Sequence, residues 1–290
     1  MKINRRSAMV SAAVLAAAAL ATRLGAADTA ANLKDHIHHS VCKWCYPKIS
    51  LDDLCVAGKS MGLQSIELLG PTDWPILQKH GLTCAITTHP VRNGLGGISK
   101  AFNRIEHHDT LIAAYEVWIP LAAKSGIKNV ICFSGNRDGM DAETGIKNCA
   151  NGIKRLMALC EKLQINLVME LLNSRVDHRD YMCDTSKWGI ALCKAVGSTR
   201  FKLLYDIYHM QIMEGDVIAT IRRDHSFFAH YHTGGVPGRN EIDETQELNY
   251  PAIMKAIVAT GYTGYVSQEF IPKRPDSIGS LRQAVGLCDV

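Results

Sequence analysis

Four apolar, β-rich runs in the second half of the chain each end on a side chain that can bind a metal ion. These terminal residues, with the runs that they close, are Glu170 (165–170), Asp206 (202–206), His232 (229–232) and Glu269 (265–269). Burying three carboxylates together is prohibitive in free energy unless a positive charge lies between them. Three oxygen donors and one imidazole suit Mn²⁺, Mg²⁺ or Co²⁺, and Zn²⁺ is also compatible with them. The pattern therefore predicts one divalent metal ion held by these four residues.

The four residues can share a metal ion only if their runs are neighbouring parallel strands that end at the same rim. After residue 27 the chain alternates apolar, β-rich runs with longer helix-patterned segments eight times. The expected strands are 37–42, 65–69, 83–87, 129–133, 166–171, 202–206, 227–232 and 264–269. The expected helices are 51–61, 74–80, 105–125, 142–163, 185–196, 216–223, 250–260 and 277–287. Eight such units predict an α/β fold, a (β/α)8 TIM barrel whose active site lies at the C-terminal ends of the strands.

An open, doubly wound sheet is the competing fold, because it also alternates strands with helices. That fold usually carries a glycine-rich phosphate-binding turn after its first strand, whereas residues 42–47 read Cys-Lys-Trp-Cys-Tyr-Pro. Neither a linker-like stretch nor a break in composition divides the chain after its N-terminal segment. We therefore expect a single barrel domain over residues 28–290.

Residues 1–27 have the three-part layout of an export signal, a signal peptide. The adjacent Arg5 and Arg6 resemble a twin-arginine signal, an uncharged Ala-rich run covers residues 8–22, and small residues follow at 25–27. A transmembrane anchor is the alternative, but the apolar run is short for spanning a bilayer. Because this run is not followed directly by a cysteine, a lipid anchor is not expected. We expect cleavage after about Ala27 and an exported, periplasmic protein without a stable membrane anchor.

The formal net charge of +4 arises in this N-terminal segment, where Lys2, Arg5, Arg6 and Arg23 occur without any acidic residue. The rest of the chain is neutral, which argues against a broad phosphate-binding surface and against nucleic-acid partners. The ten cysteines are scattered through apolar runs, so we expect buried thiols that act as small apolar groups. Cys42 and Cys45 form an isolated Cys-x-x-Cys pair, and whether they or other cysteines form disulfides is left open.

Several segments resemble the hydroxypyruvate isomerases, which fall within the xylose isomerase-like superfamily of TIM barrels, also described as sugar phosphate isomerases and epimerases. The most specific segment is 204–211, which reads Leu-Tyr-Asp-Ile-Tyr-His-Met-Gln. The others are 169–173 (Met-Glu-Leu-Leu-Asn), 230–239 with Pro-Gly-Arg at 237–239, 247–250 (Glu-Leu-Asn-Tyr), 261–264 (Gly-Tyr-Thr-Gly) and 268–272 (Gln-Glu-Phe-Ile-Pro). The resemblance covers nearly the whole chain after the signal segment and is densest after Glu170.

The resemblance implies a metal-dependent isomerase that interconverts hydroxypyruvate and tartronate semialdehyde (2-hydroxy-3-oxopropanoate), or a related small hydroxy-carbonyl compound or sugar, through an enediolate. It implies that Glu170 and Glu269 are both metal ligands and the acid/base pair, and that Asp206 and His232 complete the metal shell. It also places Arg239 and His209 at the substrate, with His209 in the loop that follows Asp206. His89, after the third expected strand, is a weaker candidate for lining the pocket.

One position departs from the hydroxypyruvate isomerase pattern. These isomerases usually have Gln where His232 stands, whereas the related ketose 3-epimerases use His there as a metal ligand. The alternative function is therefore a ketose 3-epimerase, or another exported sugar isomerase, epimerase or keto-sugar lyase of the same superfamily. Pocket shape, rather than the metal ligands, decides among these reactions.

Two functions of other classes also fit a barrel of this kind. A metal-dependent apurinic endonuclease shares the Asp-x-x-His pairing of Asp206 and His209, but its metal cluster needs further His and Asp ligands in an Asp-x-His arrangement after the seventh strand, and residues 236–243 contain no such pair. A sugar-binding barrel without turnover remains the other alternative, because fold-level analogy does not demonstrate activity. We expect a small-molecule substrate, and the sequence leaves open whether the protein forms a homo-oligomer.

Overall fold

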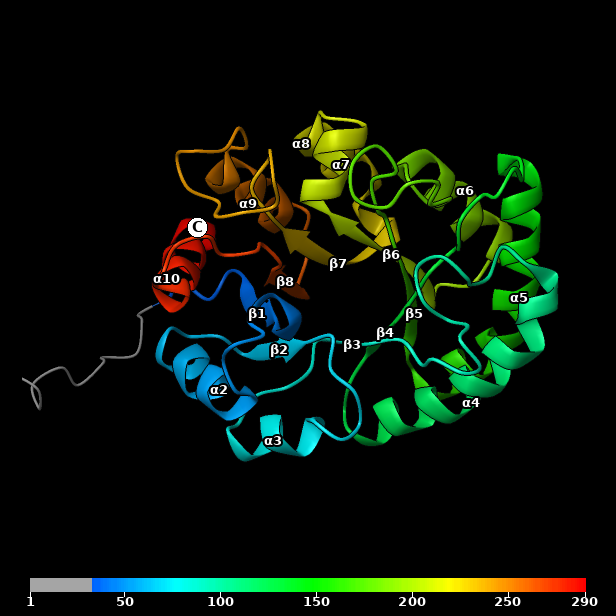
Figure 1. Ribbon diagram of the computed structural model, residues 1–290, viewed down its shortest axis with the longest axis horizontal. Helices are drawn as coiled ribbons and strands as arrows, with labels where there is room; N and C mark the ends of the chain where they lie inside the picture. The colour runs from blue at the N-terminus through cyan, green and yellow to red at the C-terminus, as the bar shows by residue number, and fades with distance from the viewer. Residues whose placement is uncertain (1–32) are drawn as a thin grey trace, which may run out of the picture. The chain divides into compact units, whose positions relative to one another are not determined.

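Eight parallel strands surround a common axis in the computed structural model, which describes residues 33–290 (Figure 1). The strands are β1 (His38–Cys42), β2 (Ser65–Glu67), β3 (Ile86–Thr87), β4 (Asn129–Cys132), β5 (Asn166–Glu170), β6 (Phe201–Asp206), β7 (Phe228–Thr233) and β8 (Tyr265–Gln268). Their order in the sheet is β2-β1-β8-β7-β6-β5-β4-β3, and every adjacent pair is parallel. Parallel bridges between Ser65 and Thr83 and between Leu69 and Thr87 join β2 to β3. The sheet is therefore closed into the predicted TIM barrel.

Helices cover the outside of the strands, as the outer ring of ribbons in Figure 1 shows. They are α2 (Leu51–Ser60), α3 (Trp74–Lys79), α4 (His108–Lys124), α5 (Ala142–Leu163), α6 (Ser186–Val196), α7 (Ile207–Met213), α8 (Val217–Asp224), α9 (Tyr250–Ala259) and α10 (Ser277–Cys288). Local sequence sets several of their limits: the Asp141 carboxylate accepts the amide of Thr144 at the start of α5, and α6 ends at Gly197 with a φ of 77°. Within residues 33–290, none of these helices combines the length and the apolar character needed to cross a membrane.

All eight expected strands and all eight expected helices are present, with small differences at their ends. The third strand is shorter than expected, because the amide of Ala85 bonds to the Ser65 hydroxyl at 2.8 Å rather than to a backbone carbonyl. The expected loop after the sixth strand is instead the short helix α7, and this placement of His209 in a loop was wrong. Asp206 caps that helix, because its Oδ1 accepts the amide of His209 at 3.0 Å.

The cysteines lie where the apolar pattern placed them. All ten are within the described residues, and each is buried with a free thiol. Burial in apolar surroundings raises the pKa of these thiols, for example those of Cys132, Cys149 and Cys183, well above the usual value. The prediction of buried thiols is confirmed. The predicted signal peptide, residues 1–27, lies outside the described residues.

Candidate active site

The C-terminal ends of β5 to β8 bring the four predicted metal ligands together. Glu170 and Asp206 are the last residues of β5 and β6, His232 is next to last in β7, and Glu269 directly follows β8. The register of the sheet pairs Asp206 directly with His232. One ligand atom from each of the four residues lies within 4.8 Å of the others, and all four side chains are buried. The barrel therefore assembles the rim that the strand ends predict.

The contacts inside this cluster leave lone pairs available for a cation. His232 Nδ1 lies 2.8 Å from Oε2 of Glu269 and 3.5 Å from Oε1 of Glu170. Glu170 Oε1 is buried without a hydrogen-bond partner among the residues of the structure. An unpartnered buried carboxylate oxygen is costly unless an ion or a ligand group meets it. The donor set of three carboxylates and one imidazole, with this unpartnered oxygen, fits a divalent cation.

Burial and neighbouring charges shift the pKa values of the four candidate ligands. Burial raises the pKa of Glu170 and raises that of Asp206 well above its usual range. Burial opposes ionisation of Glu269 as well, but His232 and Arg239 beside it hold its pKa well below the usual value. The same Glu269 carboxylate raises the pKa of His232 well above its usual value, against the effect of burial. The acids are thus too crowded to be ionised together without added positive charge.

Arg239 enters this cluster from the loop after β7. Its Nη2 donates to Oε2 of Glu269 at 2.6 Å and lies 3.5 Å from Oδ2 of Asp206. The guanidinium lies over the rings of Trp44 and Tyr208, 5.1 and 5.4 Å from their centroids. Arg239 therefore stands at the predicted site, where its charge compensates the carboxylates and its remaining donors are near the cavity.

A cavity of about 320 Å³ opens above the two glutamates. Its polar lining includes Trp44, His89, Glu170, His178, Arg239 and Glu269. His89 lies where the sequence placed it, and its ring packs against Phe133 with a centroid distance of 5.0 Å. This volume is at the lower end of the range for small-molecule sites, which is about 300–1,000 Å³. Glu170 and Glu269 both face this cavity from different strands.

His209 is placed beside the cluster rather than in the cavity wall. Its Nδ1 lies 2.6 Å from the amide nitrogen of Asn173, and its Nε2 lies 3.7 Å from Oδ2 of Asp206 without a hydrogen-bond partner among the described residues. Burial lowers the pKa of His209 well below its usual value, so the ring is neutral. The ring therefore contacts the candidate metal ligand Asp206, and the structure does not place it among the residues that line the cavity.

Three residues of the site were not found from the sequence. Glu67 of β2 and His230 of β7 are fully buried in the barrel interior next to His232, and His178 lines the cavity from the loop after β5. Glu67 lies inside the expected strand 65–69 and is not its last residue, so the pattern of strand ends does not reveal it. His178 lies in an irregular loop, where the pattern of apolar residues carries no signal.

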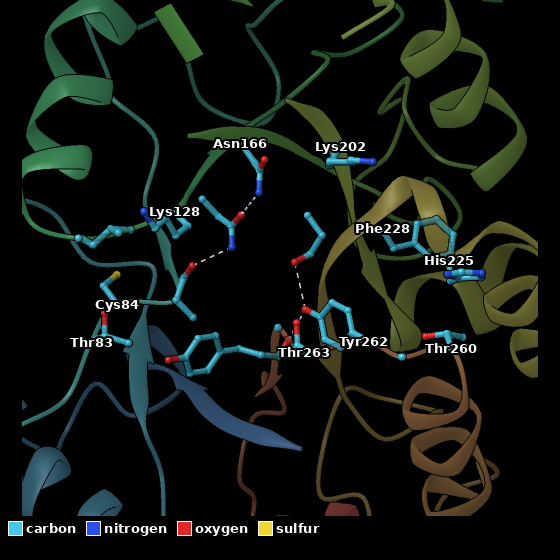
Figure 2. Close-up of a pocket in the computed structure, with 18 residues that line it drawn as sticks. Thr83, Cys84, Lys128, Asn166, Lys202, His225, Phe228, Thr260, Tyr262 and Thr263 are labelled. Carbon is cyan, nitrogen blue, oxygen red and sulfur yellow. Dashed lines mark hydrogen bonds between the residues drawn. The ribbon is translucent and has the colours of Figure 1, made fainter. Parts of the chain in front are cut away.

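A larger cavity, of about 540 Å³, lies at the opposite end of the barrel, where the strands begin (Figure 2). Asn166, the first residue of β5, donates to Asn129 Oδ1 at 2.9 Å, and Asn129 donates to the carbonyl of Ala85 at 3.0 Å. Lys202 also lines this cavity, and its ammonium group donates to the carbonyl of Ser226 at 2.6 Å. These polar groups are thus engaged in closing the floor of the barrel. Since TIM-barrel chemistry occurs at the C-terminal ends of the strands, the smaller cavity is the candidate active site.

The chain is similar in sequence to proteins named as isomerases. The chain is 36% identical to the 2-oxo-tetronate isomerase of Cupriavidus necator over 115 residues, which cover 40% of this chain and 44% of that protein. It is 27% identical to the hydroxypyruvate isomerase of Escherichia coli over 228 residues, 75% of this chain and 86% of that protein. The match to the Cupriavidus protein thus spans less than half of that relative's length.

Among solved structures, an AP endonuclease of family 2 from Brucella melitensis has a TM-score of 0.75 with 22% sequence identity, over 84% of this chain and 96% of the other. At that identity the similarity concerns the fold alone. The family described as "Xylose isomerase-like TIM barrel" matches residues 75–286. The names of the relatives agree with the resemblance seen in the sequence, and the chain belongs to the xylose isomerase-like TIM barrel family.

Proposed function

We propose that the protein is a metal-dependent isomerase of small hydroxy-carbonyl compounds, with the interconversion of hydroxypyruvate and tartronate semialdehyde as its reaction. The observation that carries this proposal is the placement of Glu170 and Glu269 around one cavity. They extend from β5 and β8, and the strands between them bear Asp206 and His232. Two carboxylates therefore flank any substrate that lies over the cluster. The names of the relatives, both isomerases, support the same reaction class.

The reaction requires a proton to leave a carbon next to a carbonyl and another to arrive at the neighbouring carbon. In hydroxypyruvate the first proton leaves the CH₂OH carbon, and the resulting enediolate receives a proton at the former carbonyl carbon. Glu170 Oε1 has no competing hydrogen bond and can exchange a proton, while Glu269 is held in place by Trp44 and Arg239. Carboxylates on two sides can remove and return the proton without a large movement of the substrate.

The metal would be held by Glu170, Asp206, His232 and Glu269, and when bound it supplies charge stabilisation for the negative oxygens of the enediolate. Arg239 lies at the cavity and can pair with the carboxylate of a small 2-oxo acid through its remaining donors. Ile131, Phe133 and Leu172 contribute apolar wall that keeps water from the reacting carbons. The small volume of the cavity favours a three- or four-carbon substrate.

A substrate panel with metal-reconstituted protein in D₂O tests the proposal. The panel holds hydroxypyruvate, tartronate semialdehyde, 2-oxo-tetronate, free ketoses and 3-keto sugars. We expect conversion of a small hydroxy-carbonyl acid, with solvent deuterium incorporated at the carbon that receives the proton. Failure of every compound to react or to exchange deuterium would contradict the proposal and favour a binding barrel without turnover.

A ketose 3-epimerase is the second candidate, and His232 is the observation that favours it. In the sequence resemblance, His at this position is typical of 3-epimerases. An epimerase returns the proton to the carbon that lost it, so the product is a diastereomeric ketose rather than an aldehyde. The same panel distinguishes the two reactions, because an epimerase would convert free ketoses and leave hydroxypyruvate unchanged.

We also propose that the protein is exported to the periplasm by the twin-arginine route, as its first 27 residues indicate. The test replaces Arg5 and Arg6 by Lys in the full-length chain, which keeps the charge of the segment. Cell fractionation should then show the precursor retained in the cytoplasm. Unchanged export of this variant would contradict the twin-arginine route.

A further inference from the structure

A second buried cluster lies against the edge of His232 that faces away from the candidate metal ligands. Glu67 is fully buried, and its Oε1 lies 2.7 Å from Nε2 of His232 and 2.8 Å from Nε2 of His230. Glu67 belongs to β2 and the two histidines to β7, with β1 and β8 between these strands in the sheet. These contacts therefore cross the interior of the barrel.

The two ring nitrogens of His232 have different surroundings. Nδ1 faces the cluster of Glu170 and Glu269, whereas Nε2 faces Glu67 alone among the carboxylates that contact the ring. Carboxylates accept hydrogen bonds, so without a metal ion both ring nitrogens of His232 donate, Nε2 to Glu67 at 2.7 Å and Nδ1 to Glu269 at 2.8 Å. A cation held by the four candidate ligands would replace the hydrogen on Nδ1 and would leave the hydrogen on Nε2 bonded to Glu67. An imidazole with its hydrogen on Nε2 can present the lone pair of Nδ1 to a metal ion.

We infer that Glu67 is a positioning residue for the metal site, an inference that rests on the proposed function. By accepting the Nε2 hydrogen of His232 it selects the tautomer and the ring orientation that offer Nδ1 to the cation. Ligating histidines commonly donate their second N–H to a carboxylate, and loss of such a partner typically lowers metal affinity about 10- to 100-fold. Glu67 contributes this bond from a strand that supplies none of the four candidate ligands.

Glu67 is itself held rigidly enough for this role. Its Oε2 accepts a hydrogen bond of 2.7 Å from Oγ of Ser40, and its Oε1 accepts from His230 as well as from His232. Three donors from two other strands thus fix both carboxylate oxygens. The His232 ring cannot rotate by 180° without losing its bond to Glu67.

The same atoms could instead belong to a second metal site, since Cys42 Sγ lies 3.7 Å from Glu67 Oε1 and 3.9 Å from His232 Nε2. Two ligands of one tetrahedral zinc ion, each about 2.0 Å from it, are about 3.3 Å apart. The 2.7 Å between Glu67 Oε1 and His232 Nε2 is shorter than that and matches a hydrogen bond. The spacing therefore favours a positioning role, and metal stoichiometry decides between the two.

The first test measures metal affinity without substrate, by chelator competition with Mn²⁺, in the Glu67→Ala and Glu67→Gln variants. We expect Glu67→Ala to bind Mn²⁺ about 10- to 100-fold more weakly, and Glu67→Gln to lose less, because the amide oxygen accepts the same bond. Glu241→Gln is the matched control: Glu241 is also buried and bonded by three donors, from Lys273, Arg274 and Ser280. Native affinity in Glu67→Ala, or an equal loss of affinity in Glu67→Ala and Glu241→Gln, would overturn the inference.

The second test reads the tautomer directly, in the native chain loaded with diamagnetic Zn²⁺. Long-range ¹H–¹⁵N correlation spectra, with the His232 signals identified by their loss in His232→Gln, should show a hydrogen on Nε2 and none on Nδ1. A hydrogen on Nδ1, or two zinc ions per chain with no hydrogen on either nitrogen, would refute the assignment. This test needs no folded Glu67→Ala protein. Because neither test uses turnover, an inactive protein that passes both would contradict only the proposed function.

Discussion

The indole nitrogen of Trp44 donates a 2.8 Å hydrogen bond to Oε1 of Glu269. Trp44 is 43% exposed and Glu269 is 3% exposed, so this bond joins the mouth of the cavity to the buried cluster. The two residues are 225 positions apart and come from the loops after β1 and β8, which are neighbours in the sheet. Trp44 therefore holds one of the two proposed proton carriers while it also forms part of the cavity wall.

We predict that Trp44→Phe lowers turnover about tenfold or more. Phe keeps an aromatic face for Arg239 but cannot donate to Glu269, and a hydrogen bond to a charged group contributes about 1.5–3 kcal/mol. Steady-state kinetics should show the loss mainly in kcat, and far-UV circular dichroism should show that the variant keeps the native fold. Native kcat in this variant would show that the bond does not position Glu269.

The second prediction concerns the two glutamates at the cavity. Glu170→Gln and Glu269→Gln keep the size of the side chain and one ligand oxygen but remove proton exchange near neutral pH. Each variant should lose at least about 100-fold in turnover, in line with general acid–base catalysis, while it retains much of its metal binding. Glu143→Gln, an exposed residue of α5, is the control and should be unaffected.

One outcome for the Glu170→Gln and Glu269→Gln variants would contradict the role of these residues as proton carriers. If both glutamates are only ligands, the activity of the variants should follow metal occupancy. Recovery of near-native turnover in excess Mn²⁺ would therefore refute the two-glutamate mechanism. It would direct attention to His209, whose Nε2 has no hydrogen-bond partner among the described residues.

The third prediction concerns the metal content of the purified protein. We expect one equivalent of a divalent metal per native chain and clearly less in His232→Ala, because Nδ1 of His232 is one of the four candidate donors that residues 33–290 bring together at the rim. His225→Ala is the control, since His225 lines the cavity at the opposite end of the barrel. Elemental analysis of the three proteins gives the answer. Equal metal in all three samples would remove His232 from the metal shell.

The rim of the barrel was predictable because parallel strands deliver their last residues to the same place. Glu170, Asp206, His232 and Glu269 could be aligned from strand ends alone, without any knowledge of side-chain contacts. Glu67, which contacts the opposite edge of the His232 ring, could not be predicted from strand ends. Glu67 meets His232 across the barrel, 165 residues away in the chain, and only the curvature and closure of the sheet bring the two together.

Contacts made by loop residues could also not be predicted from the pattern of apolar residues. The position of His209 depends on the short helix α7, which begins at an Asp206 cap that the pattern of apolar residues does not reveal. Arg239, in the loop after β7, stacks on Trp44, in the short segment after β1, and these two segments do not share a helix or a sheet. Such contacts depend on how loops from different strands fold over one another, and neither residue spacing nor amphipathicity encodes that.

The fourth prediction compares two helical glycines that differ in their surroundings. A Cβ on Gly152 of α5 would lie 2.8 Å from ring atoms of the buried His108, so Gly152→Ala should destabilise the protein by about 1–3 kcal/mol. A Cβ on Gly286 of α10 would meet nothing within 4 Å, and Gly286→Ala should stabilise by up to about 1 kcal/mol through helix propensity. Urea unfolding measures both changes. Equal effects of the two substitutions would show that His108 yields without cost.

The burial of all ten cysteine thiols sets an order of events for this chain. Thiol–disulfide exchange requires access to the attacking sulfur, so the finished barrel resists oxidants while the unfolded chain exposes every cysteine to mispairing. Reductant is therefore needed until folding is complete and is dispensable afterwards. The yield of refolded protein therefore depends on when the reductant is removed. Removal after folding leaves the yield unchanged, whereas removal before folding allows non-native disulfides to form.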